Sequence, residues 1–305
     1  MTSFSAGAVK VALRLVTFPY RINQRSLSRN VKYFYAPYRA PKGFLYEVRE
    51  YNGVKVEELT PDELRGEQII LQIHGGGAVG GMTPMYRKIS ERYARICGLR
   101  VFSIDYSAGL SRVHPELLEE CSLAYEGMLK AGYEAKNIIL TGDSMGANLA
   151  LATCLRLRDE GKELPSAIIS VCVQGDMSSQ GDSYRKNAHA DPMYALPFWQ
   201  SYNKRGARLR RISPYCGDTP LDDPYLSPAF GDYKGFPPML IQCGDVEMCE
   251  SDSDMIYGRA LAAGVKATQR KYRGMFHDFH YFAPWLRESR EAWRDIAEFI
   301  TKVLP

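Results

Sequence analysis

The sequence predicts an α/β fold in which a mostly parallel central sheet is covered by helices on both faces. Short apolar runs typical of buried strands alternate with longer segments of helical periodicity, and no repeat or low-complexity run interrupts them. The chain has 305 residues and is 45% hydrophobic, which is enough to build a large core. Because no linker divides the chain, we expect a single domain over residues 1–305 with cap elements at about 1–40 and 175–215.

The N-terminal segment predicts an amphipathic helix lying over the domain. Val9, Leu13 and Val16 recur at helical spacing. Charged residues interrupt this segment, and no small-residue cleavage site follows it, so we do not expect a signal peptide. No apolar run of the chain approaches transmembrane length.

The strands are predicted from short runs of β-forming and apolar residues. Residues 44–49 and 54–59 flank Asn52-Gly53, a dipeptide typical of a hairpin turn. Further short apolar runs predict buried strands at 68–73, 99–104, 137–140, 167–173, 239–243 and 267–272.

The helices are predicted from apolar residues at helical spacing. One face is marked by Ile89, Tyr93, Ile96 and Cys97, and a second helix follows Pro115, which suits a helix start. Residues 147–157 are apolar on almost all sides, as expected of a buried helix. Later helices are expected at 255–263 and 285–300.

Between residues 173 and 239 the alternating pattern lapses. A structureless loop of that length is unusual inside a domain, so we interpret the segment as part of a lid, with a helix around residues 198–200. Trp199 and Tyr202 are candidates for aromatic walls of a pocket. The alternative, that these side chains only hold the lid to the core, remains open.

The charge balance gives no sign of a nucleic-acid partner. The formal net charge is +4, from 39 basic and 35 acidic residues, and it is dispersed apart from short clusters such as residues 208–211. We interpret that cluster as solvated surface.

The cysteines favour a reducing compartment. There are seven, an odd number, with no C-x-x-C pair, and several lie in apolar strand or helix patterns. Reduced core cysteines of this kind indicate a cytoplasmic protein and argue against a structural zinc site. We therefore expect no metal and no cofactor.

Two short motifs carry the chemistry of a serine hydrolase. His74-Gly75-Gly76-Gly77 closes an apolar run, and its glycines let backbone N–H groups approach an oxygen that becomes negative in the transition state. Gly142-Asp143-Ser144-Met145-Gly146 follows another apolar run and has the G-x-S-x-G pattern of a nucleophile elbow, a sharp strand-to-helix turn that presents the serine hydroxyl.

With Asp223-Pro-Tyr-Leu-Ser-Pro and Gly274-Met-Phe-His277-Asp-Phe, these motifs make the chain resemble the hormone-sensitive-lipase-like esterases. This family is also called the bacterial type IV or α/β-hydrolase fold-3 family. The resemblance runs from about residue 40 to the end and implies the α/β-hydrolase fold with a helical or loop cap. Two departures bear on the pocket: Met145-Gly146 stands where the family has Ala-Gly, and Gln174-Gly175-Asp176 where it has Trp-x-Asp.

The resemblance implies a catalytic machinery. Ser144 would attack the ester carbonyl, and His277 would take its proton and later give it to the leaving alcohol. The oxyanion hole would use the N–H groups of Gly76, Gly77 and Met145. The remaining motif residues, His74, Gly75 and Asp143, are expected to support the site, His74 by bracing its turn. Other histidines considered for the base are His280, His114 and His189, which we interpret as ordinary polar residues.

Two residues compete for the role of the acid. Laying the family pattern without a gap on the segment after Pro237-Pro238 puts the catalytic carboxylate at Glu247. Asp245 falls two positions earlier, where a carboxylate can cap a turn or bond to backbone N–H groups, and it remains the alternative. The acidic residues Glu250, Asp252 and Asp254 are interpreted as charges at a helix N-terminus.

The sequence therefore predicts a serine esterase that acts on short-chain acyl esters through an acyl-enzyme, of the acetyl esterase or lactone hydrolase type. An amidase or deacetylase with the same triad is the main alternative, followed by a non-catalytic binding protein on this scaffold. The expected partner is a small-molecule ester; we expect neither nucleic acid nor a membrane span, and a homo-oligomer remains open.

Overall fold

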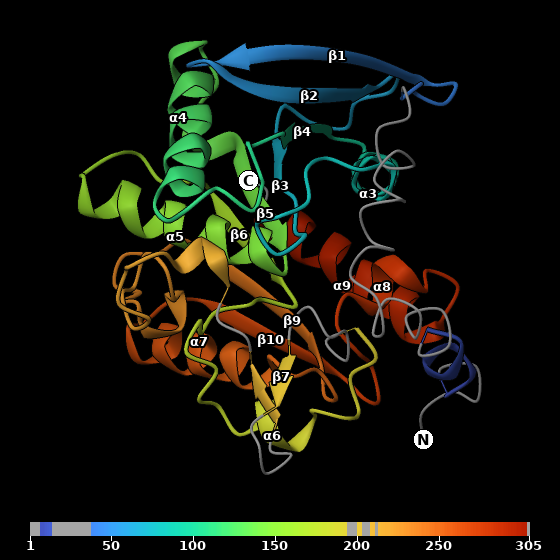
Figure 1. The fold of residues 1–305 in the computed structure, drawn as a ribbon. Helices are drawn as coiled ribbons and strands as arrows, with labels where there is room; N and C mark the ends of the chain where they lie inside the picture. Colours follow the sequence, from blue (N-terminus) through green and yellow to red (C-terminus); the bar gives the residue numbers. More distant parts are fainter. Residues whose placement is uncertain (1–6, 14–37, 194–199, 203–207, 211–212, 304–305) are drawn as a thin grey trace.

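The computed structural model describes residues 7–13, 38–193, 200–202, 208–210 and 213–303. Its centre is an eight-stranded sheet with the strand order β1-β2-β4-β3-β5-β6-β9-β10 (Figure 1). The strands are β1 (Phe44–Tyr51), β2 (Val54–Pro61), β3 (Ile69–Ile73), β4 (Arg100–Ile104), β5 (Ile138–Asp143), β6 (Ala167–Val171), β9 (Met239–Gly244) and β10 (Ala267–Tyr272).

The sheet is mostly parallel, as predicted. Only the β1–β2 hairpin and the β2–β4 pair are antiparallel, and the other neighbours pair in parallel. The hairpin turns at Asn52 and Gly53, whose φ angles of 49° and 80° suit the tight turn expected there. A parallel sheet gathers the carboxyl ends of its strands at one edge, and that edge is where ligands of such folds bind.

Helices cover both faces of the sheet (Figure 1). They are α3 (Pro84–Cys97), α4 (Glu116–Lys130), α5 (Met145–Asp159), α6 (Ser183–Lys186), α7 (Glu250–Ala262), α8 (Phe279–Phe282) and α9 (Arg287–Val303). Alternation along the strands divides the core. On β3, Leu71 packs into the cluster that holds α4, α5 and α7, whereas Ile70 packs with α3 and α9 on the opposite face.

Three expectations about elements need correction. Helix α7 begins at Glu250, five residues before the first residue predicted for it, and α9 begins at Arg287 rather than at Trp285. Trp285 follows Pro284 in a turn closed by the Leu286 N–H to the Ala283 carbonyl at 3.1 Å. Gln200 was expected in a helix but begins β7 (Gln200–Tyr202), which pairs with β8 (Arg208–Arg210), because tertiary pairing overrides local preference.

The cap elements proposed at about 1–40 and 175–215 fall partly outside the described residues, as do Val16, Trp199 and the side chain of Tyr202. Their role as a cap remains a prediction. In the described helical segment 7–13, Val9 and Leu13 pack against an apolar cluster that includes Met275 and Phe276, the residues before the predicted catalytic histidine.

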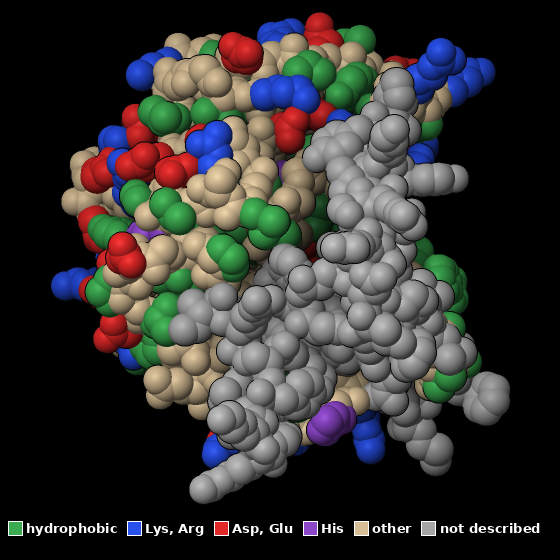
Figure 2. Space-filling model, in the orientation of Figure 1, with side chains coloured by type: hydrophobic (Ala, Val, Ile, Leu, Met, Phe, Trp, Pro, Cys, Tyr) green, Lys and Arg blue, Asp and Glu red, His purple; other side chains and the backbone are tan. Residues whose placement is uncertain are grey.

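The described surface carries charges of both signs, and the cysteines form no disulfide. Lys, Arg, Asp and Glu side chains are interspersed over the described surface seen in Figure 2, without a broad area of one sign. All seven cysteines are free. In the described part of the chain, no helix has both the length and the apolar character needed to cross a bilayer.

Candidate active site

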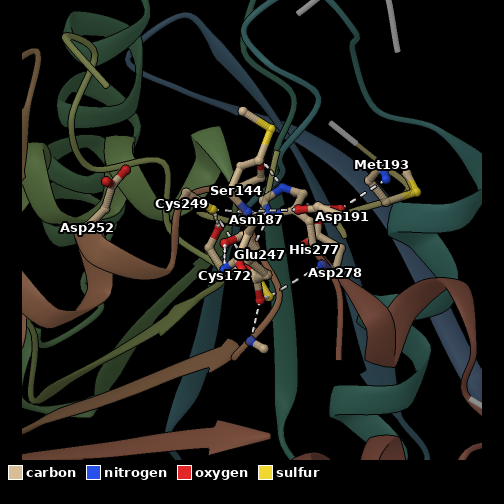
Figure 3. A network of polar contacts seen from close by, with 12 residues as sticks. Ser144, Cys172, Asn187, Asp191, Met193, Glu247, Cys249, Asp252, His277 and Asp278 are labelled. Carbon is tan, nitrogen blue, oxygen red and sulfur yellow. Dashed lines mark hydrogen bonds and ion pairs between the residues drawn. The ribbon is translucent and has the colours of Figure 1, made fainter. Parts of the chain in front are cut away.

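The predicted site residues come together at the carboxyl edge of the sheet. Ser144 follows β5, Glu247 follows β9 and His277 follows β10, while the glycine loop that begins at His74 follows β3. These segments, distant in sequence, meet because parallel strands end at a common edge, and Figure 3 shows Ser144, Glu247 and His277 grouped there.

The turn that carries Ser144 has the geometry of a nucleophile elbow. Ser144 has φ 52° and ψ −120°, a backbone conformation that residues other than glycine rarely adopt. Its N–H donates to the Val171 carbonyl at 2.9 Å. A Cβ on Gly146 would lie 2.1 Å from the Ile73 carbonyl oxygen, and one on Gly142 would lie 2.3 Å from the Gly146 carbonyl oxygen. Both positions therefore require glycine for the helix to pass so close to the strands.

A hydrogen-bonded chain links the three predicted catalytic side chains. His277 Nε2 lies 2.9 Å from Ser144 Oγ, and His277 Nδ1 lies 3.1 Å from Glu247 Oε2. When the ring proton is on Nδ1 and is donated to the Glu247 carboxylate, Nε2 can accept the serine proton. All three side chains are buried. This arrangement can deprotonate a serine hydroxyl and stabilise the resulting imidazolium.

Glu247 is held by donors on both of its oxygens. Oε1 accepts from the Gly244 N–H and from the Cys172 thiol, whose Sγ lies 3.0 Å away. Oε2 accepts from His277 and from the Cys249 thiol, whose Sγ lies 3.3 Å away. The two cysteines were expected only as core residues, and nothing in their spacing indicated contact with the acid.

Asp278 is a further carboxylate beside the imidazole that the sequence interpretation did not single out. Its Oδ2 lies 3.3 Å from His277 Nε2, on the side of the ring that faces Ser144. Burial opposes a charge on the imidazole, but Asp278 and Glu247 outweigh it and raise the pKa of His277. Burial raises the pKa of Asp278 to about 7. The imidazole and this carboxyl group therefore do not titrate independently of each other.

The glycine loop is braced by the motif residues expected to support it. The Gly75 N–H donates to Asp143 Oδ1 at 3.2 Å, which joins the loop to the elbow. Buried His74 stacks on Tyr106 with ring centroids 4.1 Å apart, and its Nδ1 lies 2.8 Å from the Gly75 carbonyl. Burial lowers the pKa of His74 to about 4, so it is neutral and serves to hold the turn.

The residues proposed for the oxyanion hole lie where their amides are available. In the described part of the chain, the Gly76 and Gly77 N–H groups, at φ 99° and 65°, donate to no acceptor. Met145 is the first residue of α5, so its N–H belongs to the turn that has no intrahelical acceptor.

The alternative acids and bases lie elsewhere. Asp245 Oδ1 accepts the Gly274 N–H at 2.5 Å, the backbone bond considered for it in the sequence. His280 is buried among aromatic rings, and burial lowers its pKa to about 3. His114 Nδ1 lies 3.2 Å from Thr219 Oγ1, and His189 is exposed.

Asp252 lies in the first turn of α7, as expected of a charge at a helix N-terminus, and it is fully buried. Its Oδ2 accepts the N–H groups of Gly175 and Asp176 at 2.9 and 3.0 Å and the Tyr184 hydroxyl at 2.7 Å. It therefore fixes the chain that leaves β6, because buried carboxylates are kept where several donors converge.

The segment after α6 holds the loop of the acid. Asn187 Nδ2 donates to the Glu247 carbonyl at 2.7 Å and to the Asp245 carbonyl at 3.2 Å. Buried Asp191 accepts the Met248 N–H at 3.1 Å, and burial raises its pKa to about 6. Figure 3 shows these side chains grouped around Glu247 and His277.

The site also holds a set of side chains able to bind a metal, which the sequence spacing did not indicate. One donor atom each from Cys172, Glu247 and His277 lies within 4.8 Å of the others.

Comparisons with known proteins identify the family and the fold. Residues 70–281 match the profile of a family described as alpha/beta hydrolase fold. An esterase from Acinetobacter venetianus is 32% identical over 252 residues, covering 82% of this chain and 80% of the relative. An acetyl-hydrolase from Streptomyces hygroscopicus is 31% identical over a match that covers 73% of this chain and 72% of the relative. A solved esterase of the bacterial hormone-sensitive lipase family superposes with a TM-score of 0.76 at 32% identity, covering 88% of this chain and 87% of that one.

Proposed function

The chain belongs to the alpha/beta hydrolase fold family, among its hormone-sensitive-lipase-like esterases, and from this premise we propose that Ser144, His277 and Glu247 hydrolyse short-chain acyl esters. The enzyme class, a serine ester hydrolase, follows from the family. The assignment of residues and the preference for short acyl groups are the proposal. The observation that carries it is the chain of contacts from Ser144 Oγ through both nitrogens of His277 to Glu247.

The reaction begins when Ser144 Oγ attacks the ester carbonyl and His277 Nε2 takes the hydroxyl proton. Glu247 keeps the other ring proton on Nδ1 and stabilises the imidazolium. The carbonyl oxygen, now negative, accepts hydrogen bonds from the N–H groups of Gly76, Gly77 and Met145. The imidazolium then protonates the leaving alcohol, and a water molecule activated by the same nitrogen releases the acid from the acyl-enzyme.

Short acyl groups are supported by one relative named an acetyl-hydrolase. A cytoplasmic location is supported by the seven free cysteines, since thiols persist in reducing compartments.

The proposal is tested by Ser144→Ala together with a panel of p-nitrophenyl esters from acetyl to palmitoyl. We expect the variant to fold and to lose about 10⁴–10⁶-fold in kcat, because the nucleophile is gone. Ser166→Ala is a matched control: Ser166 precedes β6 at the opposite edge of the sheet, where its hydroxyl bonds to the Ile138 carbonyl at 2.9 Å.

The result would contradict the proposal if Ser144→Ala kept more than a few per cent of the activity. An organophosphate that inactivates the enzyme without modifying Ser144 would do the same. Parallel lactone and amide panels decide among substrate classes, and a maximum at palmitoyl would overturn the short-chain preference.

A further inference from the structure

A cluster of three chemically different metal ligands surrounds the proposed acid. Cys172 Sγ lies 3.0 Å from Glu247 Oε1, and His277 Nδ1 lies 3.1 Å from Glu247 Oε2. The three residues follow β6, β9 and β10, and all are buried. They are therefore held by the sheet and not by exposed, independently moving loops.

The spacing of the donors suits a small divalent ion. Tetrahedral zinc with bonds of about 2.3 Å to sulfur and about 2.0–2.2 Å to nitrogen or oxygen separates its donor atoms by about 3.4–3.6 Å. The two contacts, which end on different oxygens of Glu247, need to lengthen by up to about half an ångström, and the three donor atoms, all within 4.8 Å of one another, need to draw in around the ion. Cys249 Sγ lies beside the cluster, 3.3 Å from Glu247 Oε2 and 3.4 Å from His277 Nδ1, and a water molecule would take the fourth position, as in zinc sites with three protein ligands.

The charge and the softness of the donors select the ion. A Cys172 thiolate, a Glu247 carboxylate and a neutral imidazole carry two negative charges, which balance a dication in this buried place. Sulfur and imidazole ligands favour zinc and cadmium, whereas magnesium and calcium require oxygen ligands.

We propose that Cys172, Glu247 and His277 form an inhibitory site for a thiophilic divalent cation of the zinc and cadmium class. On binding, the Cys172 thiol releases its proton to solvent, and His277 binds the ion through Nδ1 while its single ring proton moves to Nε2. A protonated Nε2 cannot accept the proton of Ser144. The inhibition rests on the proposed function, whereas the binding of the ion does not.

Binding is tested spectroscopically, with Co²⁺ as a probe for zinc, in Ser144→Ala. We expect one equivalent of Co²⁺ to give a thiolate-to-cobalt charge-transfer band that Zn²⁺ removes. The band should be absent in Ser144→Ala combined with Cys172→Ser and present when it is combined with Cys97→Ser. Cys97 is a matched control because it is free and lies at the end of α3, in the part of the core that contains α9.

Inhibition is tested by titrating ester hydrolysis with ZnCl₂, CdCl₂ and MgCl₂. We expect reversible inhibition by Zn²⁺ and Cd²⁺ that EDTA relieves, and none by Mg²⁺ at the same concentration. With each variant compared to its own uninhibited rate, Cys172→Ser should require about tenfold more Zn²⁺ than the wild type for half-maximal inhibition. Cys97→Ser should require the same Zn²⁺ concentration as the wild type. Thermal unfolding checks that each variant is folded, and Cys172→Ala replaces Cys172→Ser if the latter is not.

Two outcomes overturn the inference. One is the absence of the cobalt band in Ser144→Ala. The other is inhibition by Zn²⁺ that is unchanged in Cys172→Ser and Cys172→Ala, which would place the ion elsewhere. A protein that shows the cobalt band but hydrolyses no ester would instead refute the proposed function and leave the binding site standing.

Discussion

Replacing Glu247 with glutamine should nearly abolish turnover, and the structure explains how. Glu247 is surrounded by donors: the Gly244 N–H and the Cys172 thiol face Oε1, and His277 Nδ1 and the Cys249 thiol face Oε2. A glutamine has only one acceptor oxygen, and its NH₂ group must turn toward one of these two sides.

The side that the NH₂ group takes is set by what each neighbour can do. A backbone N–H cannot become an acceptor, and a buried donor facing another donor costs about 1–3 kcal/mol, so the glutamine oxygen should stay on the side of Gly244. The NH₂ group then meets His277 Nδ1, which must give up its proton to accept the bond. The ring proton moves to Nε2, the nitrogen that has to accept the proton of Ser144.

We therefore expect Glu247→Gln to lower kcat about 10³–10⁴-fold, as the equivalent change of tautomer does in other triads. This corresponds to about 4–5.5 kcal/mol of lost transition-state stabilisation. The measurement is steady-state hydrolysis of p-nitrophenyl acetate, with thermal unfolding to show that the variant is folded.

Asp245→Asn is the matched control. Asp245 lies two residues away, and its Oδ1 accepts the Gly274 N–H, a bond that the amide oxygen of asparagine can also make. We expect turnover within about threefold of wild type and a small loss of stability, about 1 kcal/mol. If Asp245→Asn lost most of its kcat and Glu247→Gln kept a near-normal kcat, the assignment of the acid would be wrong.

Three further predictions follow from the same geometry. Because His277 must be neutral to act as a base, kcat/KM should fall at acid pH. Asp278→Asn removes a negative charge that raises the pKa of His277, so the acid limb of the pH profile should move to lower pH. An acid limb that does not move would show that Asp278 does not act on the base. Gly75→Ala should lower the free energy of unfolding by about 1–3 kcal/mol, since the new Cβ would lie 2.2 Å from Asp143 Oδ2 and 2.9 Å from its carbonyl oxygen, and an unchanged urea midpoint would contradict this. Dialysis against EDTA should leave activity intact, and a loss that a divalent ion restores would mean that hydrolysis depends on a metal.

The elements and the proposed triad were open to prediction because their signals are local. The alternation of strand and helix patterns along the sequence predicted the mostly parallel sheet. The glycines around Ser144 reflect a close approach of backbone that no other residue allows, since a Cβ on Gly146 would lie 2.1 Å from the Ile73 carbonyl oxygen. Glu247 and His277 could be singled out because the resemblance to the family places each of them on a motif position.

The surroundings of the triad could not be predicted because they arise from packing across the sheet. Asp278 reaches His277 Nε2 through a left-handed backbone conformation, with φ 53°, that its sequence position does not reveal. Cys172 contacts Glu247 across 75 residues of chain. Asp252 lies at a helix N-terminus as expected, but its spacing did not reveal that it is buried under the chain leaving β6.

The bonds from Asn187 and Asp191 to the acid loop limit how freely this enzyme can change its specificity. Pocket-forming segments of a hydrolase are natural targets for exchange, both in evolution and in the laboratory. Here residues 183–193, which belong to the predicted cap, hold the backbone on both sides of Glu247. Grafting this segment from another protein would therefore disturb the reaction along with the choice of substrate, unless an amide and a carboxylate equivalent to these two were carried over with it.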